Sequence, residues 1–161
     1  MINRATGLLI LLSIGMSQEQ YDIINLINEE GVYKQKFTDE ILNGIIYQIL
    51  DERKLVLGNL KNGKKDGLWT EWYPNKRKLE ETYKQGMLDG SVSLFYKSGQ
   101  REWRHTYNNG EFEGLWTFWY ENGQKMKEGS FECGDSTGIW IWWNKNGHVK
   151  KEKKFKKRKN G

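Results

Sequence analysis

The chain has 161 residues, with 8 Trp and 18 Gly but only 1 Pro, and its mean hydropathy is −0.84. Disorder is disfavoured because Trp and Tyr bury large areas, and the scarcity of Val, Leu and Ile argues against a broad α/β core. The net charge is +5, but residues 150–159 hold eight basic side chains against one acid, which leaves a net −2 elsewhere and argues against a basic, nucleic-acid-binding body.

Residues 1–17 predict a secretory signal peptide. The stretch MINRATGLLILLSIGMS has one basic residue, Arg4, then an apolar run, then small residues at Gly15 and Ser17. The apolar run is about half of the roughly 20 residues that cross a bilayer. We therefore expect export to the periplasm, the cell envelope or the medium, and not an integral membrane protein. The alternative is a buried N-terminal strand or helix.

Residues 18–36 are expected to cap the segment that follows. An amphipathic helix from Tyr21 to Ile27 is one alternative, since apolar residues recur there at helical spacing. We favour the other, a hairpin with its turn at Gly31 that covers the open edge of a sheet, because terminal units of repeat arrays need a modified cap.

From Phe37 to Gly161 the sequence repeats every 23 or 24 residues. A large apolar residue recurs at this spacing near the end of each unit, from Phe37 to Phe155. Five units are recognised by their leading glycines, which are Gly44, Gly67, Gly90, Gly114 and Gly138. The first unit is degenerate, with aliphatic residues in the aromatic places.

Each unit predicts a β-hairpin. In the unit at 114–134, residues 115–120 form the first strand and 124–131 the second, and Asn122-Gly123 supplies a two-residue turn with positive φ at both positions. The Gly-x-x-x-Gly segment at 110–114 is expected to connect hairpins. Asn75-Lys76 lacks the glycine and predicts the weakest turn. Consecutive hairpins then form an all-β, elongated, single-sheet antiparallel meander.

The alternation of side chains along a strand predicts two ladders on opposite faces of this sheet, unless a bulge intervenes. One ladder holds Ile46, Trp69, Val92, Trp116 and Trp140, and the other holds Ile49, Trp72, Phe95, Trp119 and Trp143. In a single sheet, one ladder must be covered by twist, by long Lys and Glu stems, or by a partner.

The unit G-x-W-x-x-W-Y-x-N-G followed by E-G-x-F-x-x-G, clearest at 114–134, resembles the bacterial MORN-repeat variant family, which includes YwqK-type putative antitoxin component proteins. The resemblance covers about three quarters of the chain. It implies a non-enzymatic β-hairpin repeat protein that binds proteins or lipids, with an antitoxin-like role as one expectation.

We expect no catalytic site, cofactor or metal. His105 and His148 fall at different repeat positions, and His105 is expected to be exposed on the sheet. Acidic residues are scattered without the fixed pair that hydrolysis needs, and the single cysteine, Cys133, gives no metal-ligand spacing.

Seven tryptophans are candidate partner-binding residues. Trp142 is the best single candidate, because it replaces the charged Glu71 of an earlier unit. An unidentified protein, bound to a monomeric chain, is the expected partner. The hypothesis covers Trp69, Trp72, Trp116, Trp119, Trp140, Trp142 and Trp143.

The Lys-rich end has three interpretations. We favour a last strand whose lysines discourage edge-to-edge aggregation. Attraction to anionic lipid or an envelope polymer comes second, and nucleic-acid binding is the least favoured. The candidate anionic-surface residues are Lys153, Lys154, Lys156, Lys157 and Arg158.

Overall fold

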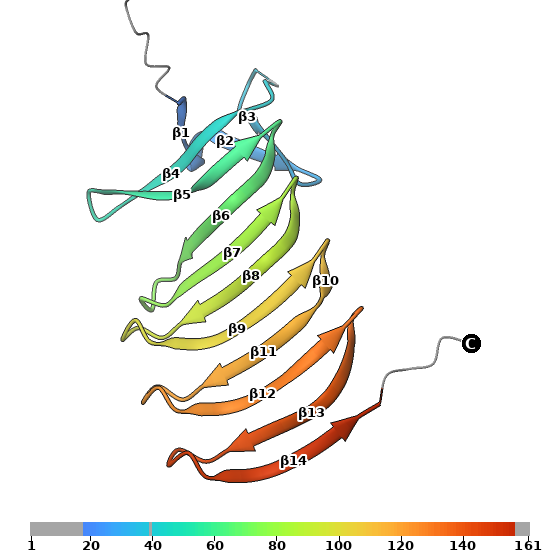
Figure 1. Ribbon diagram of the computed structural model, residues 1–161. Coiled ribbons are helices and arrows are strands. Elements are labelled where there is room, and N and C mark those ends of the chain that lie inside the picture. The colour runs from blue at the N-terminus through green and yellow to red at the C-terminus, as the bar shows by residue number, and fades with distance from the viewer. Residues whose placement is uncertain (1–17, 39, 157–161) are drawn as a thin grey trace, which may run out of the picture.

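The computed structural model describes residues 18–38 and 40–156, so the predicted signal peptide at 1–17, Lys157 and Arg158 lie outside the described residues. The described part forms an elongated stack of curved strands (Figure 1). In chain order the elements are β1 (Gln20–Asp22), the 3-10 helix η1 (Ile23–Asn25), β2 (Leu26–Glu29), β3 (Val32–Gln35), β4 (Gly44–Leu50), β5 (Arg53–Lys61), β6 (Lys64–Trp72), β7 (Lys78–Lys84), β8 (Met87–Phe95), β9 (Arg101–Asn108), β10 (Glu111–Phe112), β11 (Gly114–Trp119), β12 (Lys125–Glu132), β13 (Asp135–Trp143) and β14 (Val149–Phe155).

One large sheet runs through the molecule in the order β1-β4-β5-β6-β7-β8-β9-β11-β12-β13-β14, with β10 paired to β9. From β4 onward each strand pairs antiparallel with the next, which confirms the predicted all-β meander of consecutive hairpins. The exceptions are a parallel pair, β1 with β4, and a separate two-stranded sheet, β2 with β3.

The Asn-Gly loops differ from the prediction. Gly123 N donates to Tyr120 O at 2.9 Å, Tyr120 N donates to Gln124 O at 2.9 Å, and Gly123 has φ 84° whereas Asn122 is not among the positive-φ residues. The loop therefore has three residues and ends in a left-handed glycine, so the predicted two-residue turn is wrong here. Asn122 serves the loop through its side chain, whose Oδ1 accepts from Gln124 N at 3.1 Å.

Two-residue turns with positive φ at both positions occur at the opposite ends of the strands, where only connectors were expected. Asn109 and Gly110 have φ 47° and 85°, and Cys133 and Gly134 have φ 49° and 80°. Each of these turns joins directly paired strand ends, such as Glu132 with Asp135. The chain is thus a continuous meander with two kinds of turn in alternation.

The leading glycines bend the strands. Gly114 and Gly138 have φ 70° and 67°, which L side chains rarely adopt. Across the bend, the rings of Phe112 and Trp116 meet edge to face with centroids 4.4 Å apart, although four residues of straight strand would separate them by about 13 Å. The strand ends therefore fold toward the face that carries Trp116, and this face is concave.

The two predicted ladders lie on opposite faces. The pairing of β11 with β12 shifts near Trp119 because β12 contains an extra residue, Met126, so the alternation within β11 is undisturbed. We call the concave face, with Trp69, Val92, Trp116 and Trp140, the aromatic face. We call the opposite face, with Trp72, Phe95, Trp119 and Trp143, the ladder face.

The N-terminal cap contains the favoured hairpin, but that hairpin does not pair with the sheet edge. The edge strand β4 pairs with β1 instead, while β2 and β3 lie on the aromatic face, where Tyr33 N donates to Gly63 O at 2.6 Å. This placement buries Leu26 in a hydrophobic core cluster that also contains Leu42, Ile46, Leu57, Leu60 and Trp69.

Phe37 does not extend the ring register of the later units, because it is fully exposed in a turn with φ 70°. Successive units are held together by side chains as well as by strand pairing. Tyr96 and Tyr120 each donate their hydroxyl to a backbone carbonyl 23 residues later, at 2.9 Å.

Candidate binding faces

Three of the seven candidate tryptophans are engaged by basic side chains on the ladder face. Each cation comes from the start of the second strand of a hairpin and lies over one or two rings, at 4.4 to 5.8 Å from their centroids. In order along the sheet these residues are Trp72, Lys78, Phe95, Arg101, Trp119, Lys125 and Trp143. Such contacts contribute about 0.5–1 kcal/mol each, so intramolecular packing accounts for these tryptophans.

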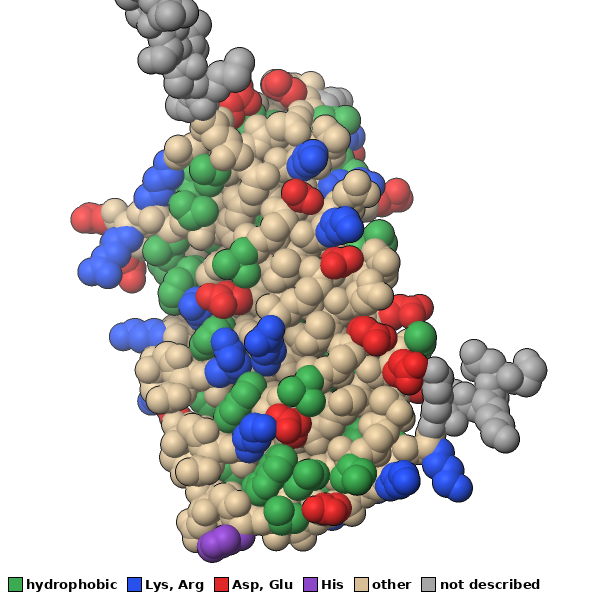
Figure 2. Space-filling view, viewed as in Figure 1, with side chains coloured by type: hydrophobic (Ala, Val, Ile, Leu, Met, Phe, Trp, Pro, Cys, Tyr) green, Lys and Arg blue, Asp and Glu red, His purple; other side chains and the backbone are tan. Residues whose placement is uncertain are grey.

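Charges of both signs are intermixed with hydrophobic side chains on the face drawn in Figure 2. On the ladder face, Lys125 forms an ion pair with Glu128 at 2.6 Å, and Lys78 forms one with Glu80 at 2.6 Å. The seven tryptophans therefore do not form one site. The remaining four, Trp69, Trp116, Trp140 and Trp142, share the aromatic face.

The N-terminal part of the aromatic face is covered by the chain itself. Tyr33 of the hairpin stacks on Trp69 with centroids 5.9 Å apart, and Trp69 Nε1 donates to Asn59 O at 3.0 Å. The indole also lies against Gly58, where a Cβ atom would be 2.4 Å from the ring. Trp69 is only 4% exposed and is therefore a core residue rather than a free contact.

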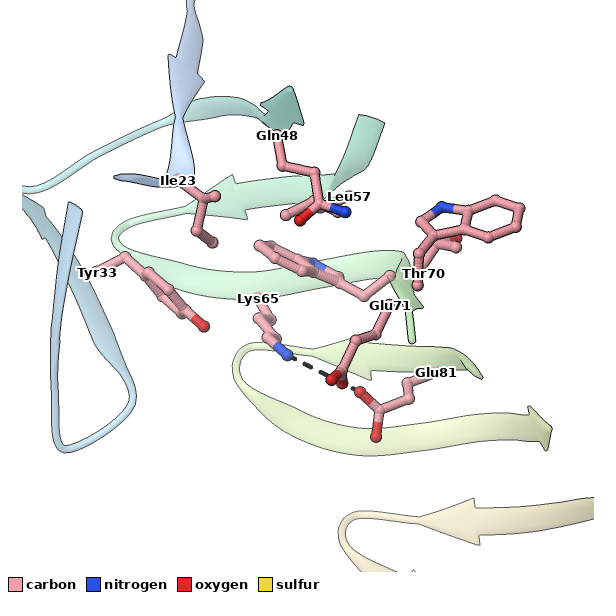
Figure 3. A pocket seen from close by; sticks show the side chains of 10 residues that line it. Ile23, Tyr33, Gln48, Leu57, Lys65, Thr70, Glu71 and Glu81 are labelled. Atoms are coloured by element: carbon pink, nitrogen blue, oxygen red, sulfur yellow. Dashed lines mark ion pairs between the residues drawn. The ribbon is translucent and has the colours of Figure 1, made fainter. Parts of the chain in front are cut away.

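A cavity of about 240 Å³ lies between the hairpin and the sheet. Lys65, Glu71 and Glu81 converge there (Figure 3), and Lys65 Nζ is 3.8 Å from Glu81 Oε2. The same ammonium lies 4.7 Å from the centroids of Trp69 and Tyr83. The chain's own Lys65 therefore occupies the place beside these carboxylates and rings where a bound cation would lie. We interpret the cavity as part of the packing between the hairpin and the sheet.

His105 occupies the middle of the aromatic face and is buried, contrary to the expectation of an exposed histidine. Its ring is stacked between Trp103 and Trp116, with centroids 4.2 and 3.6 Å away. Burial, and secondarily the Lys127 ammonium, lowers the pKa of His105 to about 4. Its Nε2 has no hydrogen-bond partner among the described residues, and neither does Trp116 Nε1.

The C-terminal part of the aromatic face combines rings with lysines. Trp142 lies directly opposite Lys127 on β12 and Lys151 on β14, and their ammonium groups are 5.6 and 5.1 Å from its centroid. Lys127 also lies 4.5 Å from the centroid of Trp140, which is 3% exposed. Trp142 is half-buried, so it is the more accessible of these two tryptophans.

The structure divides the predicted anionic-surface residues. Lys153 faces Trp140 across the strand pair, on the aromatic face, whereas Lys154 pairs with Ile139 on the ladder face. Lys156 follows the end of β14 and is exposed. The Lys-rich end therefore forms the last strand of the sheet, up to Phe155. Its lysines lie on both faces of the sheet and do not form a single patch.

Sequence reasoning missed Lys127, Tyr33 and the burial of His105. Lys127 could have been found, because writing the strands in register places it opposite Trp142. The burial of His105 had no consistent signal, because the equivalent positions of other units hold Gly58, Glu81, Gly129 and Lys153. The contact of Tyr33 with Trp69 leaves no periodic trace in the sequence.

Among residues 18–38 and 40–156, no group of three or more His, Cys, Asp or Glu side chains is placed to hold a metal ion. Within the same residues, no helix combines the length and the apolar character that crossing a membrane requires.

Comparison with known families gives three matches to one repeat. Residues 65–85, 112–132 and 136–157 match the family described as MORN repeat variant. These segments correspond to β6–β7, β10–β12 and the last hairpin, so the repeat identified by the family is the structural unit described above. No curated protein matches the chain significantly.

Proposed function

We propose that this protein is a non-catalytic repeat scaffold that binds a partner protein on the uncovered part of its aromatic face. The observation that carries this proposal is the uneven cover of that face. The hairpin shields Trp69, whereas no element of the described residues packs over Phe118 and Trp142. Rings left half-buried on a concave surface are typical of protein contact sites. The MORN repeat matches support a repeat protein of the binding type.

Export is part of the proposal, and it rests on the sequence of residues 1–17. The partner would then be met outside the cytoplasm. The family resemblance adds an antitoxin-like role, in which the bound partner is a toxin. Fractionation of cells that express the full chain tests export, and an unprocessed product confined to the cytosol would contradict it.

Photo-crosslinking in the native cell tests the binding face. A photoreactive amino acid is placed at Trp142 on the aromatic face or, as the matched control on the same strand, at Ile139 on the ladder face, which is 56% exposed. We expect a discrete adduct from position 142 and none from 139. An adduct from 139 alone, or none from either position, would contradict the proposal.

A second candidate function is binding to anionic lipid or an envelope polymer through the Lys-rich end. It is favoured by the exposed basic strand β14, since basic residues near an anionic surface contribute about 1 kcal/mol each. Deletion of residues 150–161 should then abolish pelleting with anionic vesicles, and added salt should weaken it. Pelleting that persists after the deletion would count against this function.

A further inference from the structure

The aromatic face changes its charge from one end to the other. Around Trp69, the equivalent positions hold Glu71 and Glu81, and Glu81 pairs with Lys65. Around Trp140 they hold Trp142 and Lys153, together with Lys127 and Lys151. These positions are equivalent in the repeat, so the change from acidic to basic side chains comes from the sequence of each unit and not from a difference in fold.

The three lysines at the C-terminal end have no ion-pair partner among the described residues, whereas Lys65, Lys78 and Lys125 each form one. Lys127, Lys151 and Lys153 instead lie over rings of the same face, at 4.5–5.6 Å from the ring centroids. Burial on this face lowers the pKa of Lys127, because the ammonium group is partly removed from water. Lys127 and Lys151 flank the half-buried indole of Trp142, and Lys153 lies over Phe155 on the same face. Three ammonium groups without a carboxylate partner on one surface are complementary to an anionic ligand.

The chain itself supplies the precedent for what can occupy this face. The hairpin β2–β3 seats a tyrosine on Trp69 and bonds its backbone to the turn at Gly63, 2.6 Å from Tyr33 N. The uncovered surface is continuous with the part that the hairpin occupies. A flat bilayer fits a concave face poorly, because the bent strand ends, such as Phe112 over Trp116, rise beside it.

We propose that the C-terminal part of the aromatic face binds an acidic segment of the partner protein, with a carboxylate held by Lys127 and Lys151 beside Trp142. This inference rests on the proposed function and specifies the chemistry of the partner. An aromatic or aliphatic side chain of the same segment packs on the Trp142 ring, and the carboxylate replaces the missing ion-pair partners of the lysines.

Binding of a synthetic peptide of alternating Glu and Tyr residues, measured by fluorescence anisotropy, tests the inference. The double variant Lys127→Gln/Lys151→Gln should bind this peptide at least about tenfold more weakly than the wild type. The matched control, Lys154→Gln/Lys156→Gln, loses the same charge from the same end of the chain and should change binding less than about twofold. Circular dichroism confirms that both variants are folded.

Several results would overturn the inference. These are equal losses in the two double variants, no binding of the acidic peptide by the wild type, or tighter binding of an alternating Lys and Tyr peptide. Vesicles of phosphatidylcholine and phosphatidylserine form a further arm, and binding to them without binding to the peptide would assign the lysines to a lipid surface. If the peptide fails while position 142 still crosslinks to a partner in cells, the proposed function stands and only the acidic chemistry is wrong.

Discussion

Lys76 occupies a loop position at which the next three units have glycine. It has φ 64°, close to the 84° of Gly123, although a lysine in this conformation is destabilised by about 1–2 kcal/mol. Lys76→Gly should therefore raise the free energy of unfolding by about 1 kcal/mol, after the extra entropy of glycine in the unfolded chain is subtracted. Urea denaturation checks this.

The control for this variant is Gly123→Ala, which introduces the same strain in another unit and should lower the free energy of unfolding by about 1 kcal/mol. A loss of stability in Lys76→Gly would show that the lysine side chain contributes more than its backbone conformation costs.

His105 should make stability depend on pH. Its folded pKa of about 4 lies below the unfolded value near 6.5, so the unfolded state binds the proton more tightly. Stability is therefore full above pH 6.5, falls as the pH decreases from 6.5 to 4, and then levels off for this group. The loss is at most about 3 kcal/mol.

Replacement of this histidine isolates its contribution. His105→Phe keeps a ring between Trp103 and Trp116 and should flatten the pH dependence between pH 6.5 and 4 relative to the wild type. His148→Gln changes an exposed histidine and should leave the dependence as it is. Parallel curves for the wild type and His105→Phe would contradict the assignment.

At the scale of the element, a tryptophan on one strand lies over a residue of the preceding strand, and that residue must leave room for the ring. Gly129 lies under Trp140, and a Cβ atom there would be 2.0 Å from the indole. Gly58 stands in the same relation to Trp69, whereas the unit with Val92 has Glu81 across from it. A tryptophan that lies across the neighbouring strand thus requires either a glycine beneath it or a flat ring, such as that of His105, on which it can stack.

This pairing predicts the outcome of two substitutions. Gly129→Ala should lower the free energy of unfolding by about 2 kcal/mol, because the indole must leave its buried position. The double variant Gly129→Ala/Trp140→Val should cost less than the two single variants added together, as measured by denaturation. Strict additivity would show that the contact with Trp140 is not the cause.

At the scale of the whole molecule, stability is expected to be uneven. The fully buried side chains Leu42, Ile46 and Leu60 all lie at the N-terminal end, where the hairpin forms a second layer. Among the described residues, the sheet has no second layer at its C-terminal end. Because each unit contacts only its neighbours, local opening is expected to begin at the single-layered end.

Amide hydrogen exchange tests this gradient. Protection should be greatest in β4, β5 and β6 and smallest in β14. Tyr33→Ala, which removes the ring stacked on Trp69, should reduce protection at the N-terminal end and leave β13 unchanged. Uniform protection along the sheet would contradict a unit-by-unit architecture.

The repeat was readable from the sequence because turn residues and rings recur at a fixed spacing. Leading glycines such as Gly114 and the alternation of Trp116 with Trp119 predicted the meander and its two ladders. The turn types were wrong, because Asn-Gly suits several turns, and only the pairing of Tyr120 with Gln124 decides between two and three loop residues.

The candidate site was predicted as a set of tryptophans, and the structure separated that set. Spacing cannot show which ring is covered, since Trp69 and Trp116 occupy the same position in their units. Cover depends on Tyr33, which is 36 residues from Trp69 and belongs to no repeat.

By itself, the sequence determined the hairpin unit and its register, because local turn chemistry and side-chain alternation act over a few residues. Tertiary structure alone decided that the strands bend, that the aromatic face is concave, and that the hairpin lies on this face instead of at the edge. It also brought Lys127 and Lys151 to opposite sides of Trp142. These features depend on contacts between units, which a local sequence pattern does not encode.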